Sequence, residues 1–179
     1  GFLAALVAYG VSLACGISPT RFALADAPAL TADAVLKVMV LGAACAVVSR
    51  LFCGLLHFTE HELPQRLPNP WVRVAVGGMA GVALSYLMGV GRYNGAGMGV
   101  IAAAVEQGEA LPWDFLCKAL LTAVTLASGF TGGEEVPSFY IGATFGCAVG
   151  PLLGLPAGFS AAVGLVAVFC GATNTLIPS

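Results

Sequence analysis

Two adjacent glutamates stand in an otherwise uncharged part of this sequence. They lie in the run GGEEVP, residues 132–137, and are the only charged side chains after Lys118. Proline is favoured in the first turn of a helix, where its missing N–H costs nothing. We therefore expect a helix to begin within this run, with free backbone N–H groups and the positive end of its dipole at the start. Such a terminus binds anions, and the paired glycines let an ion approach the backbone.

The two carboxylates at this helix start, Glu134 and Glu135, suggest that a proton moves together with the anion. Two ionised carboxylates beside a bound anion in a low dielectric cost a large free energy. Either one carboxylate points away, to water or to a partner, or at least one carries a proton. A protonatable carboxylate beside an anion is what an anion/proton exchanger requires, and ionisable residues at membrane depth are functional by default. The alternative is that these acidic side chains only cap the helix.

A second pattern of chemical interest spells H-x-x-E-H at His57, Glu60 and His61. It matches the inverted zinc-protease motif, and Glu134 or Glu135 could supply a further ligand. The motif begins a polar stretch, residues 57–73, that contains three prolines and that we expect to be an aqueous loop. We therefore interpret the histidines as interfacial side chains and expect no metal site, and an intramembrane zinc hydrolase is the rival hypothesis.

The composition is that of a membrane protein. The 179 residues are 59% hydrophobic and 9% charged, with a mean hydropathy of +0.94, whereas soluble domains carry about a quarter charged residues. Apolar stretches cover residues 1–20, 35–56 and 72–90, and a bilayer span takes roughly 20 such residues. The net charge of −2 offers no basic patch for nucleic acid.

The later apolar segments are short and interrupted by glycine and proline. Residues 93–105 and 115–128 are too short to cross a bilayer, and residues 137–155 and 159–177 should form the last two helices. Broken helices at membrane depth are tolerated where the backbone is buried in protein or lines a polar cavity, which favours a transport pathway. Glycines at every fourth position from Gly142 to Gly158, and at Gly77 and Gly81, predict close helix packing.

The broken-helix region is poor in basic residues, which bears on how an ion would be held. We expect backbone amides rather than a fixed lysine or arginine to bind the anion. A full positive charge would hold the ion too tightly for turnover.

Three stretches of the sequence resemble motifs of the CLC family of chloride channels and anion/proton antiporters. The family's second-half G-G-x-F-x-P motif, with the helix after it, is similar to GFTGGEEVPSFYIGATFG. Its short segment two elements earlier resembles GRYNGAGMGVIAAAV, and its helix that ends in a polar-proline turn resembles VGLVAVFCGATNTLIPS. The runs GGE and GATNT look closer to the bacterial branch that includes fluoride/proton antiporters.

The resemblance implies a fold and a site. The fold would be an all-α polytopic membrane domain with broken and re-entrant helices, of which residues 1–179 form the second inverted repeat. The anion would be held mainly by the backbone of Gly132, Gly133, Glu134, Glu135 and Val136. The proton-linked position would fall on Glu134, whereas Glu135 stands where the family has phenylalanine and Val136 where the fluoride branch usually has threonine.

The resemblance also implies a function and partners. We expect transport of chloride or fluoride, as a channel or as an antiporter with protons, by a homodimer in the lipid of a bacterial inner membrane. The first span and the last helix would contribute to the dimer interface. The family's first-half gating glutamate, G-S-G-x-P loop and C-terminal pore tyrosine have no counterpart here, so we expect that this segment does not transport alone. We expect no cofactor and no enzymatic activity; a membrane packing subunit without a pore is the third hypothesis.

Overall fold

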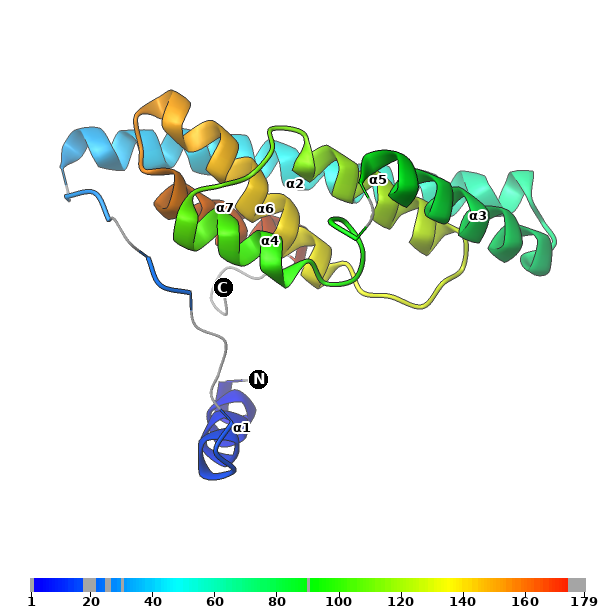
Figure 1. The fold of residues 1–179 in the computed structure, drawn as a ribbon, viewed down its shortest axis with the longest axis horizontal. Helices are drawn as coiled ribbons and strands as arrows, with labels where there is room; N and C mark the ends of the chain where they lie inside the picture. Colours follow the sequence, from blue (N-terminus) through cyan, green and yellow to red (C-terminus); the bar gives the residue numbers. More distant parts are fainter. Residues whose placement is uncertain (1, 18–21, 25–26, 30, 90, 174–179) are drawn as a thin grey trace.

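The computed structural model describes residues 2–17, 22–24, 27–29, 31–89 and 91–173, and Figure 1 shows their arrangement. Helices and turns, without a strand, make up this described part. The elements are α1 (Phe2–Ala14), α2 (Ala32–Arg66), α3 (Pro70–Met88), α4 (Met98–Ala102), the π-helical turn η1 (Ala103–Gln107), α5 (Asp114–Ala127), α6 (Glu135–Val149), the 3-10 turn η2 (Gly150–Leu153) and α7 (Ala157–Thr173).

The helix α2 is longer than the sequence predicts. Residues 57–66 continue it as helix, so the expectation of an aqueous loop from residue 57 is wrong for this stretch. Side-chain pairs one turn apart support the extension: Arg66 contacts Glu62 at 3.3 Å, and the Gln65 amide lies 2.8 Å from the His61 ring. Pro64 lies within the last turn of α2 and leaves the carbonyl oxygen of Glu60 without its helical N–H donor.

Side-chain caps fix where the two long helices begin. The Thr31 hydroxyl accepts from the backbone N–H of Ala34 at 3.2 Å, and the Asn69 carbonyl oxygen accepts from that of Trp71 at 3.0 Å. Pro70 then occupies the first helical position of α3, as expected of proline. The predicted span over residues 72–90 corresponds to α3, which begins two residues earlier and ends at Met88. Residue 90 lies outside the described residues.

The short apolar segments form short helices, as predicted. Over residues 93–105 the chain makes a turn and then α4 with η1, and residues 115–128 correspond to α5. Neither helix reaches the length of a bilayer span. In the described part of the chain, the helices long and apolar enough to cross a membrane are α2, α3 and the α6–η2 pair, Glu135–Leu153.

Small residues bring α6 and α7 into close contact, which confirms the packing predicted from the glycine spacing for this helix pair, whereas Gly81 has no neighbour within 4 Å. A methyl group on Gly142 would overlap the backbone of Gly164, and one on Gly146 would overlap the carbonyl oxygen of Ser160. The helix α6 therefore lies against α7 along its length and also contacts α2, α4 and α5 (Figure 1). Buried apolar side chains on both sides of α6, among them Ile141 and Tyr140, make it the centre of the core.

The ends of the chain match the predictions only in part. The first predicted span, residues 1–20, is helical over Phe2–Ala14, and α1 lies apart from the other helices in Figure 1. Residues 18–20 of that span lie outside the described residues. So do residues 174–177 of the last predicted helix and the polar-proline turn that follows it.

Candidate functional site

The helix start predicted in the GGEEVP run is present. The helix α6 begins at Glu135, and its first backbone hydrogen bond runs from the N–H of Ser138 to the carbonyl oxygen of Glu134 at 3.0 Å. Pro137 has no N–H to contribute. The amides of Glu135 and Val136 therefore precede the first helical hydrogen bond and are the free donors of this terminus.

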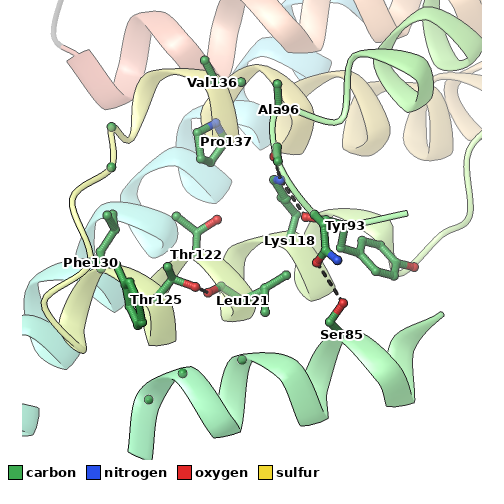
Figure 2. A pocket seen from close by; sticks show the side chains of 18 of the residues that line it. Ser85, Tyr93, Ala96, Lys118, Leu121, Thr122, Thr125, Phe130, Val136 and Pro137 are labelled. Atoms are coloured by element: carbon green, nitrogen blue, oxygen red, sulfur yellow. Dashed lines mark hydrogen bonds between the residues drawn. The ribbon is translucent and has the colours of Figure 1, made fainter. Parts of the chain in front are cut away.

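This terminus opens onto a cavity of about 900 Å³. Figure 2 shows its walls: α3 with Ser85, the turn that contains Tyr93 and Ala96, α5 with Lys118 and Thr122, and the start of α6 with Val136 and Pro137. Further lining residues come from the small-residue face of α3 and from the segment that leads into α6: Gly77, Gly78, Gly81, Phe130, Gly132, Gly133 and Glu135.

The structure brings most of the predicted anion-binding residues to this cavity and leaves one aside. Gly132, Gly133, Glu135 and Val136 line it. Glu134 is exposed but is not among the lining residues, and it lies within electrostatic range of Cys53 on α2. The two adjacent glutamates thus have different surroundings.

One lining residue was missed by the sequence analysis. Lys118 on α5 is 4% exposed, and its ammonium donates to the carbonyl oxygens of Tyr93 at 2.8 Å and Gly95 at 2.6 Å. The broken-helix region thus contains a buried basic side chain, and the expectation that backbone amides rather than a lysine bind the anion stays a prediction. The signal was available, because Lys118 is the only basic residue within an apolar segment that is too short to span.

An ion pair between the half-exposed Arg92 and the buried Asp114 holds the neighbouring turn in place. Asp114, the first residue of α5, is fully buried and accepts from Arg92 at 2.7 and 3.1 Å and from the Tyr93 hydroxyl at 2.7 Å. The N–H of Leu111 donates to the same carboxylate at 3.0 Å. On the other side of the turn, the Ser85 hydroxyl lies 2.8 Å from the Asn94 side-chain oxygen (Figure 2). These contacts fix the turn that forms one wall of the cavity.

The H-x-x-E-H residues lie elsewhere, on the distal half of α2. His57, Glu60 and His61 are all exposed there. Over the described residues, no group of three or more His, Cys, Asp or Glu side chains is placed to hold a metal ion. Neither Glu134 nor Glu135 is brought to the histidines as a further ligand.

The sequence pattern of the voltage gated chloride channel family matches residues 1–179. The chain belongs to that family. It is 35% identical, over 97% of its length, to a protein named chloride/fluoride channel protein from Pseudomonas syringae pv. tomato (strain ATCC BAA-871 / DC3000). Its fold matches the crystal structure of a CLC-type fluoride/proton antiporter with a TM-score of 0.90, at 37% identity and over 97% of this chain.

The match confirms the predicted fold class, an all-α CLC-type membrane fold with broken helices. It lends no support to an intramembrane zinc hydrolase or to a packing subunit without a pore. The chain spans 39% of the Pseudomonas protein and 44% of the antiporter chain. Both proteins are more than twice as long as this chain, so the ions named for them belong to the whole proteins.

Proposed function

We propose that the protein carries a small halide anion, chloride or fluoride, across a membrane. The observation that carries this proposal is the α6 terminus: the free amides of Glu135 and Val136 face a cavity in a chain of the CLC family. A helix start of this kind attracts an anion through its N–H groups and its dipole. Backbone donors suit transport because each N–H contributes only a partial charge, so the ion can bind and still leave.

The binding residues that we propose are Gly132, Gly133, Glu134, Glu135 and Val136, acting mainly through their backbone. The glycines leave the approach to the amides free of side chains, since both lie in an exposed, non-helical segment before α6. Glu134 is our candidate for the residue that carries or relays a proton. Its carboxylate stands at the first turn of the same helix but off the cavity wall, so it need not oppose the anion directly.

The setting of this activity is also a proposal. Residues 1–179 would form the second half of the pore-forming unit of a homodimer, embedded in the lipid of a bacterial inner membrane. One relative is named a chloride/fluoride channel and the other a fluoride/proton antiporter. Both names support a halide as the transported ion, and the second supports a proton as its counter-substrate.

A flux assay with the full-length protein in liposomes tests the proposal. Chloride and fluoride efflux are followed with electrodes while proton uptake is followed with a pH-sensitive dye. We expect halide efflux accompanied by proton uptake. Halide efflux without proton movement would contradict the antiporter and leave a channel, and absence of halide efflux would contradict the proposal as a whole.

The variant Glu134→Gln tests the proton role. The amide keeps the size of the side chain but cannot carry a proton, so we expect proton uptake to be lost while halide efflux persists. The matched control is Glu109→Gln, which removes an exposed carboxylate from the turn before α5. Unchanged proton coupling in Glu134→Gln would remove this residue from the proton path.

A further inference from the structure

We propose that Lys118 supplies a fixed positive charge that sets the affinity of the cavity for its halide. This inference rests on the proposed function and adds to it a side chain outside the GGEEVP run. The charge would act at the cavity wall formed by α5, whereas the amides act from the start of α6.

The position of Lys118 is fixed by hydrogen bonds rather than by a counter-ion. Its ammonium donates to the carbonyl oxygens of Tyr93 and Gly95, and Figure 2 shows it between α5 and the turn that these residues belong to. The ammonium also lies 5.1 Å from the centre of the Tyr140 ring. An ammonium has three N–H donors, so these two bonds leave one donor for a further ligand.

The charge of Lys118 is not neutralised within the described part of the chain. The ion pairs found there join Lys37 to Asp33, Arg66 to Glu62 and Arg92 to Asp114. Asp114 is the acidic residue one helical turn before Lys118, but its oxygens already accept from Arg92, Tyr93 and the backbone.

The cluster of Arg92, Asp114 and Lys118 therefore carries a net positive charge. Arg92 and Asp114 cancel each other, and the ammonium of Lys118 remains. The carboxylate of Glu135 also lines the cavity, but no ion pair joins it to Lys118 among the described residues. An anion that enters the cavity would be the counter-ion that Lys118 lacks.

A buried lysine without a counter-ion is more often functional than structural in a membrane protein. Burial of a charge without a counter-ion is unfavourable, and such residues within membrane proteins mark ion pathways. The carbonyl oxygens of Tyr93 and Gly95 would repel an anion if they were free. Lys118 donates to both oxygens, and its positive charge would make this wall of the cavity attractive to an anion.

The competing explanation is that Lys118 only clamps the turn at residues 93–95. Two substitutions separate charge from clamping. Lys118→Gln keeps an N–H donor for the carbonyl oxygens but removes the charge, whereas Lys118→Arg keeps the charge and the donors. The matched control is Lys37→Gln, which removes a lysine from an i,i+4 surface pair on α2 and leaves the cavity wall unchanged.

The experiment measures halide affinity by calorimetry and the halide dependence of flux in liposomes, with the full-length protein. We expect about ten-fold weaker halide affinity in Lys118→Gln, a charge effect over several ångströms of protein, with wild-type affinity in Lys118→Arg and Lys37→Gln. Wild-type affinity in folded Lys118→Gln would overturn the inference. Equal losses of halide affinity in Lys118→Gln and Lys118→Arg would also overturn it. Such a result would mean that Lys118 acts by holding the turn at residues 93–95 and not through its charge.

The test also distinguishes a variant that does not fold from a failure of the proposed function. If Lys118→Gln does not fold, Lys118→His replaces it, since the imidazole gains its charge as the pH falls; we expect its halide affinity to rise at low pH beyond any change in wild type, and a parallel response would overturn the inference. If the wild type transports no halide, the proposed function itself fails. A transporting wild type with an unaffected Lys118→Gln rejects the role of Lys118 alone.

Discussion

Glu134 and Glu135 are neighbours in the chain, but only one of them lines the cavity. Glu135 is the first residue of α6 and lines the cavity together with Val136, whereas Glu134 precedes the helix and is exposed outside the cavity lining. This geometry resolves the electrostatic difficulty of two carboxylates beside one anion. Glu135 remains the unfavourable one, because its negative charge lies on the wall where an anion would bind.

Removal of that charge should strengthen halide binding. We expect Glu135→Gln to raise halide affinity by up to about ten-fold, since the amide keeps the shape of the side chain but no longer repels the ion. Calorimetric titration with chloride and fluoride measures the change, and Glu62→Gln on α2 serves as a control for net charge. Unchanged or weaker binding in Glu135→Gln would show that this carboxylate does not face the ion.

At the scale of the helices, the close α6–α7 contact holds in place the helix whose start we propose as the anion site. A methyl group on Gly146 would overlap the carbonyl oxygen of Ser160, and backbone atoms cannot yield as a flexible side chain can. We expect Gly146→Ala to destabilise the folded protein by about 1–3 kcal/mol. A thermal melt in detergent should show this as a lower unfolding temperature.

The control for this prediction is Gly54→Ala on α2, where a methyl group would have no neighbour within 4 Å. Alanine is the better helix former, so its melting temperature should not fall. Equal stability of Gly146→Ala and the wild type would mean that the two helices separate at no cost, which would contradict the close packing.

The sequence predicted the helices well and the tertiary contacts poorly, for a physical reason. Pro137 and the paired glycines carry a local signal, so the start of α6 could be placed before the structure was known. The extension of α2 depends on pairs such as Glu62 with Arg66, a weak signal beside Pro64. Lys118 acquires its partners from a turn more than twenty positions earlier in the chain, which no local pattern reveals.

At the scale of the whole molecule, α2 is too long for the membrane alone. Its 35 residues extend about 52 Å at the helical rise, against a hydrocarbon core of about 30 Å. A span of some 20 residues from its start would therefore leave the distal, polar end beyond the core. His57, Glu60 and His61 all belong to that end. Their helical spacing matches a zinc-binding motif, but all three are exposed and none lines the cavity.

Halide transport should therefore not depend on zinc. We expect the double variant His57→Ala/His61→Ala, and wild-type protein dialysed against a chelator, to transport halide within about two-fold of untreated protein, as is usual for changes at exposed sites. Metal analysis of the same preparations supplies the control, because it shows whether any zinc was present to be removed. Loss of both zinc and transport on either treatment would tie the distal end of α2 to function. Transport that survives would exclude a zinc requirement, and the H-x-x-E-H pattern would then be no more than polar residues on one helical face.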